Sequence, residues 1–187
     1  MAIGVDAGAS ATTGSNNIYL GRGVTGVAGQ SNTMYLGKVG TQTRTLIAGV
    51  RGITTGEASA ITVVIDSTGQ LGTVSSSRRY KEDIQDMGHA SAGLLVLRPV
   101  TFRYTQAYAD GAKPIQYGLI AEDVAEVYPD LDVYDAEGRP ETVQYRKVNA
   151  MLLNEVQRLS RNNEAQQSQI EALSERLAAV EQRVVTN

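Results

Sequence analysis

The chain has 187 residues, no cysteine, one histidine and a formal net charge of -3. Without cysteine it can form neither disulfides nor thiolate metal sites, and His89 alone cannot make a histidine-based metal site. The slightly acidic balance argues against nonspecific nucleic-acid binding, and the lack of an apolar run of about 18 residues argues against a membrane-spanning helix.

The composition changes near residue 74. Residues 1–74 hold most of the 19 glycines and few charged residues, whereas residues 75–187 hold most of the charge. This contrast predicts a fibrous segment followed by a globular piece that ends in a helix. With nine tyrosines, one phenylalanine and no tryptophan, the chain has few large rings for a compact core. That scarcity favours a protein whose core is built between subunits.

A short motif repeats within the first segment. Residues 15–21 (SNNIYLG) return as residues 31–37 (SNTMYLG), sixteen positions later, and residues 44–49 (RTLIAG) are a looser echo. Short apolar strands closed by glycine are typical of a β-roll or β-helix, in which stacking or trimerisation buries faces that one unit cannot bury. The alternative is a flexible linker rich in glycine and serine, which the repeated Tyr-Leu-Gly disfavours. Two further strands are expected at residues 61–65 and 71–74.

A mixed α/β domain is predicted over residues 75–146. Residues 81–97 are expected to be helical with a break at Gly88, and Pro99 ends this helix because a residue before proline avoids the helical region. The other elements follow in chain order: strands at residues 100–104 and 115–120, a helix at 121–127, and hairpin strands at 131–134 and 142–145.

From about residue 147 the sequence follows heptads. The seam positions are Leu152, Val156, Leu159, Asn163, Gln166, Ile170, Leu173, Leu177, Val180 and Val184. This stripe predicts a coiled coil over residues 147–187 that associates parallel chains, with two polar layers that fix the register at a cost in stability. The alternative is one amphipathic helix packed on its own domain, although so narrow a stripe suits a partner helix better than a broad core face.

Residues 75–84 (SSSRRYKEDI) lie where the composition changes. Ser76 and Lys81 are the two residues that a Ser–Lys dyad needs, in which an unprotonated lysine takes the serine proton and the serine attacks a carbonyl. Lysine becomes a base only where burial or nearby positive charge disfavours its ammonium form, and Arg78 and Arg79 are placed to help. Because a thin single-chain core offers little burial, we expect the site to form only when subunits pack. The alternative is a solvated loop in which the serine and the lysine never meet.

Four ordered blocks have a recognisable pattern. They are residues 76–84 (SSRRYKEDI), residues 97–104 (LRPVTFRY), residues 117–124 (YGLIAEDV) with Tyr128 and Pro129, and Tyr145 followed by residues 152–156 (LLNEV). Together they resemble the endosialidase-type intramolecular chaperone domain, the S74 peptidase family, over residues 75–187. The resemblance implies a domain that drives trimerisation and folding of the β-rich segment before it, then cuts the chain at its own N-terminal boundary.

The resemblance also implies roles for individual residues. Ser76 is the nucleophile, Lys81 is its general base, and Arg79 orients the site or stabilises an oxyanion. The scissile bond flanks Ser76, and the Ser76–Ser77 bond is favoured. Ser77 stands where the family usually has aspartate, which leaves open whether the chain is cut, and three consecutive serines leave the nucleophile's register open by one residue.

These observations predict an α+β homotrimer, with a repetitive β segment over residues 1–74, a chaperone domain over 75–146 and a coiled coil over 147–187. The seam residues lean towards a dimer, but the repeat and the resemblance favour a trimer. The predicted activity is that of a single-turnover, self-cleaving serine endopeptidase. The alternative is a non-cleaving trimeric stalk or adhesin with an inactive dyad.

The expected partners are copies of the same chain. The sequence shows no glycine-rich phosphate loop with lysine, no histidine pair and no cofactor fingerprint, so we expect no cofactor, metal, nucleic acid or membrane. The resemblance implies assembly in the cytoplasm and a place in a phage tail fibre or a bacterial surface or tail-like appendage. Whether the mature fibre binds a host-surface glycan or another receptor is left open.

Overall fold

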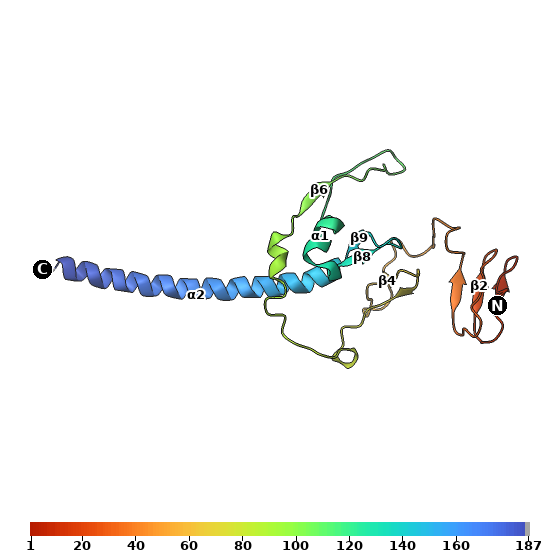
Figure 1. Cartoon of the computed structure of the whole chain (residues 1–187), viewed down its shortest axis with the longest axis horizontal. Helices are drawn as coiled ribbons and strands as arrows, with labels where there is room; N and C mark the ends of the chain where they lie inside the picture. Colours follow the sequence, from red (N-terminus) through yellow and green to blue (C-terminus); the bar gives the residue numbers. More distant parts are fainter. Residues whose placement is uncertain (186–187) are drawn as a thin grey trace. The chain divides into compact units, whose positions relative to one another are not determined.

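The structure is a computed structural model that describes residues 1–185 (Figure 1). The chain divides into two compact units at the boundary between Ser75 and Ser76. Within the described residues the fold is α+β: short strands pair in small sheets, and the helices belong to the second unit. The predicted fold class is therefore confirmed at this level, whereas the β-roll, the coiled coil and the trimer stay predictions.

Three strands of the first unit pair in parallel. They are β1 (Ala2–Ile3), β2 (Ile18–Leu20) and β3 (Met34–Leu36), in that order across the sheet. Strands β2 and β3 come from the two copies of the repeated motif, and each residue of β2 lies opposite its equivalent in β3. Residues one repeat period apart in the sequence are therefore the residues that pair between β2 and β3.

Like residues of the repeat lie on top of one another in this sheet. The Asn16 side-chain amide donates to Oδ1 of Asn32 at 3.1 Å, sixteen residues later. The rings of Tyr19 and Tyr35 stack with centroids 5.8 Å apart. Stacked aromatic pairs and side-chain amide ladders stabilise neighbouring strands beyond the backbone bonds. The repeated residues thus hold the copies in register.

The sequence pattern did not predict strand β1. Its residues pair with Tyr19 and Leu20, seventeen positions later and so one residue more than the repeat period. The available signal was the Ile-Gly dipeptide at residues 3–4, which matches Leu-Gly at residues 20–21. Conversely, the looser echo at residues 44–49 forms no strand in the structure. The two-residue match at residues 3–4 therefore marks a strand, whereas the longer match at residues 44–49 does not.

A separate two-stranded sheet follows in the same unit. Strands β4 (Val64–Ile65) and β5 (Leu71–Gly72) pair antiparallel within the regions predicted as strands. Gly69 adopts a φ of 86° in the connecting turn, and Asp66 Oδ1 accepts hydrogen bonds from the amides of Thr68 and Gln70. An aspartate that bonds its own turn and a left-handed glycine are the residues such a turn requires.

Gly26 makes room for the buried ring of Tyr19. A Cβ atom at residue 26 would lie 2.6 Å from the Tyr19 hydroxyl and 2.8 Å from Cβ of Ala11. We expect Gly26→Ala to destabilise this sheet by about 1–3 kcal/mol through overpacking, and hydrogen exchange at the amides of β2 and β3 should accelerate. Gly56→Ala is the control, because a Cβ there meets nothing within 4 Å; equal exchange in both variants would contradict the packing role.

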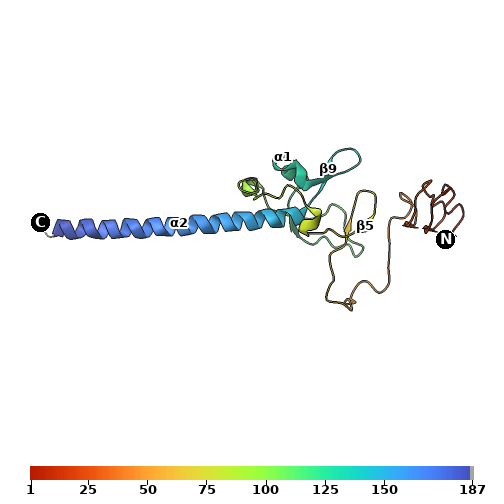
Figure 2. The same cartoon turned by 90° about the horizontal axis from the view of Figure 1, so that it is seen from below.

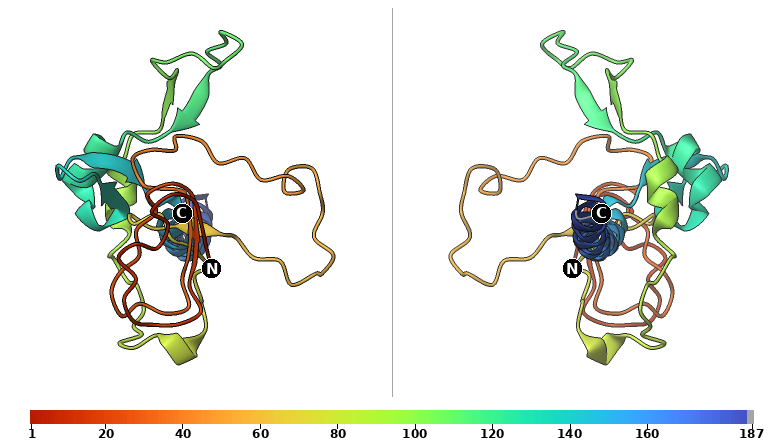
Figure 3. Two further views of the ribbon diagram at one scale, coloured as in Figure 1. Left: turned by 90° about the vertical axis from the view of Figure 1, so that its right-hand side faces the viewer. Right: turned by 90° about the vertical axis from the view of Figure 1, so that its left-hand side faces the viewer.

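The second unit contains two antiparallel hairpins and a short helix. Strands β6 (Val100–Phe102) and β7 (Gln116–Gly118) pair through a long loop, and β8 (Asp132–Tyr134) pairs with β9 (Pro140–Val143). Helix α1 (Ala121–Val127) packs on the second hairpin. Figure 3 shows the loop beyond β6 and β7 extending away from α1, β8 and β9. Strands β6, β7 and β8 lie in the predicted regions and α1 has the predicted bounds, whereas β9 begins and ends two residues before the strand predicted at residues 142–145.

The core of this unit is small and lies under α1. Val124, Leu131, Val143 and Val148 form one buried cluster, supplied by α1, the segment before β8, β9 and the long helix α2 (Tyr145–Val185). The helix continues far beyond this cluster (Figure 2). The predicted C-terminal helix is confirmed as far as Val185, and residues 186–187 of the prediction lie outside the described residues. Only the first turns of α2 are covered by its own chain.

The predicted helix over residues 81–97 was wrong. The structure has an irregular loop over residues 81–91 and only a short 3-10 helix after it, η2 (Ala92–Val96). Another short 3-10 helix, η1 (Arg78–Tyr80), precedes the predicted range. The loop's apolar side chains, Ile84 and Met87, are exposed. Most helix stability in proteins comes from packing an apolar face, and this segment has no such face to bury.

Candidate functional site

A single turn brings Ser76 close to Lys81. Ser77 precedes the 3-10 helix η1 with extended backbone angles, and its carbonyl accepts a hydrogen bond from the Tyr80 amide at 3.1 Å. The Lys81 amide donates to the Arg78 carbonyl, also at 3.1 Å. This turn reverses the chain, and Nζ of Lys81 donates to Oγ of Ser76 at 3.2 Å.

Arg79 interacts with Ser77. Its backbone amide and its Nε donate to Oγ of Ser77 at 3.4 and 3.2 Å. Its guanidinium lies 5.6 Å from the centre of the Tyr80 ring, within the range of a cation–π contact. The Ser77 hydroxyl therefore acts as the cap of η1 and as the acceptor that orients Arg79. The structure places Arg79 beside the Ser76–Lys81 pair without assigning it a catalytic role.

The pair is open to solvent in the single chain. Ser76, Arg79 and Lys81 are exposed, Ser77 is half-buried, and η1 buries no residue. A lysine that serves as a general base needs a desolvated or strongly positive setting. One chain provides the contact between hydroxyl and amine and the neighbouring arginines, but it does not provide the burial. The single chain therefore does not bury Ser76 and Lys81 away from water.

Substitutions at Ser77 should change the stability of this turn. Ser77→Ala removes the acceptor for Arg79, and losing an N-cap oxygen costs about 0.5–2 kcal/mol. Ser77→Asp should tighten the turn, because a carboxylate accepts stronger, charge-assisted bonds. The NMR signal of the Arg79 Nε–H reports both: we expect faster solvent exchange in the alanine variant and slower exchange in the aspartate variant. The same exchange rate in all three proteins would contradict the capping role.

A buried polar cluster joins the loop before η2 to helix α2. Ser91 is fully buried, and its hydroxyl donates to Oε1 of Glu155 at 2.6 Å. The Asn154 side-chain amide donates to the Gly88 carbonyl at 2.8 Å and to Oγ of Ser91 at 2.6 Å. Arg158 donates through Nε to Oε2 of Glu155 at 2.9 Å. We call these five residues the polar latch.

The charge in the polar latch is compensated. Hydrogen bonds from Arg158 and Ser91 hold the pKa of the Glu155 carboxyl below its usual range, although its burial acts in the opposite direction. Glu155 is 3% exposed. The sequence did not predict this cluster, because Gly88 and Ser91 are more than 60 residues away from the residues of α2 that they contact. The one local signal was a glutamate and an arginine three residues apart beside the predicted seam.

Asp132 is buried without compensation. It is 5% exposed, and neither carboxylate oxygen has a hydrogen-bond partner within residues 1–185. Burial raises the pKa of Asp132, and the nearby charge of Glu122 raises it further. A raised pKa means that the folded state favours the neutral acid. The contribution of Asp132 to stability is fully present below the pKa that it has in the unfolded chain. This contribution is lost as the pH rises through the pKa that Asp132 has in the folded chain.

Asp132→Asn should therefore stabilise the second unit at neutral pH. We expect a gain of about 1 kcal/mol at pH 7, because the variant removes an unpaired buried charge, and no gain below the unfolded pKa of aspartate. Thermal unfolding at several pH values measures it. Asp135→Asn is the control, and its effect on stability at pH 7 should have the opposite sign. Hydrogen bonds from the Arg139 amide, the Arg139 side chain and other backbone amides lower the pKa of Asp135. A wild type more stable than Asp132→Asn at pH 7 would contradict the assignment.

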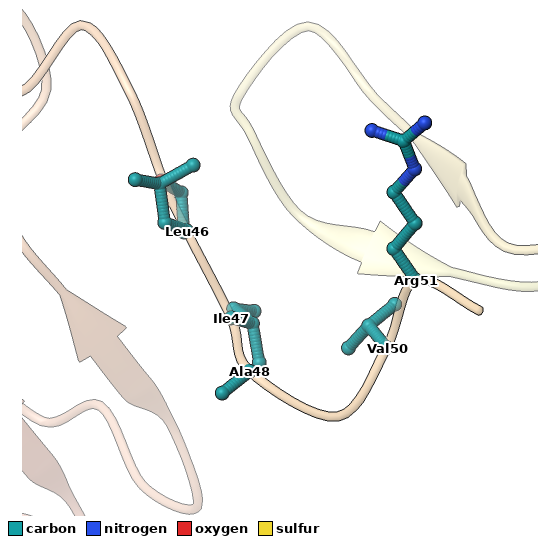
Figure 4. Close-up of a pocket in the computed structure, with 6 residues that line it drawn as sticks. Leu46, Ile47, Ala48, Val50 and Arg51 are labelled. Carbon is teal, nitrogen blue, oxygen red and sulfur yellow. The ribbon is translucent and has the colours of Figure 1, made fainter. Parts of the chain in front are cut away.

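The chain has no enclosed small-molecule site among its described residues. One open hollow is lined by residues of one loop, including Leu46, Ile47 and Val50 (Figure 4). It is open and apolar, and it lacks the converging polar groups of a ligand site. Within residues 1–185 no group of three or more histidine, cysteine, aspartate or glutamate residues is arranged to hold a metal ion. Nor does any helix of that range have the length and apolar character needed to cross a membrane.

Comparison with known proteins points to one part of the chain. The family model described as chaperone of endosialidase, of the S74 peptidases, matches residues 76–133. The match begins at Ser76, includes the whole turn to Lys81, and continues through η2, α1 and the start of the second hairpin. No curated protein matches the chain.

Proposed function

Because residues 76–133 form a chaperone domain of this endosialidase-chaperone family, we propose that the second unit assembles the β-rich first unit into a homotrimer and then releases it by Ser–Lys autoproteolysis. The observation that carries the proposal is the 3.2 Å hydrogen bond from Lys81 to Ser76. It lies where the family match begins and where the two units meet in sequence. A cut there separates fibre from chaperone.

The chemistry needs only these two side chains and water. The neutral Lys81 amine accepts the Ser76 hydroxyl proton while Oγ attacks a backbone carbonyl next to Ser76. The C–N bond then breaks, the leaving amine takes the proton back from the ammonium, and water hydrolyses the resulting ester. Each chain is cut once, so the reaction is single-turnover.

Ring size distinguishes the two bonds that flank Ser76. Within one chain, Oγ of Ser76 reaches the carbonyl of Ser75 through an unstrained five-membered ring. Its own carbonyl would require a strained four-membered ring. A cut at the favoured Ser76–Ser77 bond therefore needs the Ser76 hydroxyl of another copy, whereas a cut at the Ser75–Ser76 bond can occur within one chain. The masses of the products identify which geometry operates.

Association supplies the cover that the single chain lacks. The seam side chains of α2 are all exposed: Leu152, Val156, Leu159, Ile170, Leu173, Leu177, Val180 and Val184. Large apolar side chains repeated along one helix face favour a partner helix. Apolar side chains between Val39 and Leu71 in the first unit are exposed as well. We propose that copies of the chain cover both regions, and that packing around Ser76 and Lys81 then activates the amine.

A second candidate function has one observation in its favour. Ser77 stands where the family usually has aspartate, and a neutral cap holds Arg79 less firmly than a carboxylate would. The chain would then be a non-cleaving trimeric stalk or adhesin with the same architecture. In either case the domain fits a phage tail fibre or a bacterial surface appendage, and the partner of the mature fibre is a glycan or another receptor on a host surface.

Mass spectrometry of the purified chain distinguishes the two functions. Under native conditions we expect a trimer. Under denaturing conditions we expect two products, residues 1–76 and 77–187 or residues 1–75 and 76–187. A native trimer made of intact chains would support the stalk, and a native monomer would contradict both functions.

A further inference from the structure

Helix α2 has two neighbouring faces in its first turns. The inner face carries Val148, Met151, Glu155 and Arg158, which are buried or half-buried against the helix's own unit. The outer face carries Leu152, Val156 and Leu159, which are exposed. Each outer residue from 152 onward follows an inner one directly in sequence, so the faces differ by one residue, or about 100° of rotation.

Beyond Val148, which lies in the buried core, apolar packing does not select between these faces. Leu152 and Leu153 are as apolar as Val148 and Met151, so apolar side chains surround much of the helix here. Cores accept many hydrophobic substitutions if volume and pattern are kept. A roll of α2 by one residue would bring Leu152 and Val156 into the places of Met151 and Glu155 at little apolar cost. At the start of the helix it would also bring Asn149 into the place of the buried Val148, which the core opposes.

The polar latch opposes this roll. In the observed rotation Glu155 accepts from Ser91 and Arg158, and Asn154 donates to Ser91 and Gly88. The roll that brings Val156 into the place of Glu155 would carry Glu155 into the place of Asn154. The Asn154 bonds to Ser91 and Gly88 would then be lost, and the Glu155 carboxylate would lie near the Gly88 carbonyl oxygen, which cannot donate to it. Buried polar groups that lose their partners are strongly disfavoured.

We propose that the polar latch is a specificity device that fixes the rotation of α2, so that the Leu152, Val156 and Leu159 stripe faces the other copies of the chain. Buried polar networks in other proteins select one arrangement among several of similar apolar packing. The proposal rests on the proposed function in one respect: it takes copies of the same chain as the partner of the stripe.

Disulfide cross-linking between copies reads the rotation directly, because the chain contains no cysteine. Disulfides form only between residues whose Cα atoms come within about 7 Å. Val156→Cys places the reporter on the outer face, and Leu153→Cys places it one position away from that stripe. In the otherwise unchanged chain we expect oxidation to cross-link the residue-156 reporter several-fold more than the residue-153 reporter.

An apolar replacement of the polar latch separates specificity from stability. The variant Ser91→Ala, Glu155→Met, Arg158→Leu removes charge and partner together, so its thermal stability should be retained or raised. We expect the preference for the residue-156 reporter to fall, because the core packing of Val148 alone then holds the rotation of α2. Asn154→Ala leaves no unpaired charge and should lower the cross-linking preference in part. This variant tests the proposal if the triple variant fails to fold. The matched control is Arg161→Leu, Glu164→Met, an exposed pair of the same spacing that lies outside the polar latch.

The outcomes are distinct. An unchanged cross-linking preference in both latch variants would overturn the role of the polar latch while leaving the proposed assembly intact. A wild-type chain that is monomeric and forms no cross-link at residue 156 would overturn the proposed assembly, and the proposal with it. Loss of the preference in the control would show that added apolar surface is the cause, and would also overturn the proposal.

Discussion

Ser76→Ala should give a full-length chain that still assembles. Without the hydroxyl that Lys81 contacts at 3.2 Å, no nucleophile remains in the proposed reaction. We expect the rate of cleavage to fall by at least about 10³-fold, the scale on which catalytic serines contribute. Denaturing mass spectrometry over time measures the cleavage, and native mass spectrometry measures the assembly.

The neighbouring residues provide the controls. Ser75→Ala should cleave at close to the wild-type rate, while Lys81→Met should resemble Ser76→Ala because it removes the base. Lys81→Arg keeps the positive charge but cannot give up its proton, so it should be inactive as well. Cleavage that survives in Ser76→Ala and is lost in Ser75→Ala or Ser77→Ala would move the nucleophile by one residue.

Placing aspartate at two seam positions should prevent both assembly and cleavage. Leu159 and Ile170 are exposed in the single chain, so Leu159→Asp with Ile170→Asp should leave the fold of one chain intact. In a coiled coil the same positions are buried, and each buried carboxylate costs several kcal/mol. We expect a folded monomer that stays uncut. Native mass spectrometry, circular dichroism and a denaturing gel check the three parts.

Two outward positions of the same helix give a matched control. Gln157→Asp with Ala165→Asp adds the same charge away from the seam, and this variant should assemble and cleave normally. A seam variant that is monomeric and still cleaves at the wild-type rate would refute the dependence of chemistry on assembly. A seam variant that remains a trimer would refute the assignment of the seam.

Elements with a strong local pattern were predictable from the sequence. Helix α1 matches its predicted bounds, because Glu122 and Asp123 suit its first turn and Pro129 follows its end. The hairpin of β8 and β9 follows from alternating residues around a polar turn. The segment before η2 was not predictable, since an isolated helical pattern forms only if a tertiary partner covers its apolar face.

The candidate site combines a contact between residues close in sequence with contacts between segments far apart in sequence. A turn of a few residues sets the contact of Ser76 with Lys81. Their spacing alone did not predict this contact, and the expectation came from the family resemblance of the surrounding blocks. The polar latch and the burial of Asp132 depend on segments that are distant in sequence, and no local pattern encodes them. In the proposed assembly the burial of Ser76 and Lys81 depends on other copies of the chain, which neither the sequence nor one folded chain contains.

The most direct test is the rate of cleavage during refolding from denaturant at a series of chain concentrations. One chain holds hydroxyl and amine within hydrogen-bond reach yet leaves both in water, so cutting should begin only as copies associate. The account predicts a per-chain rate that falls steeply on dilution and recovers when chains are concentrated again. A rate that is the same at every concentration, or intact chains in a fully assembled trimer, would contradict it.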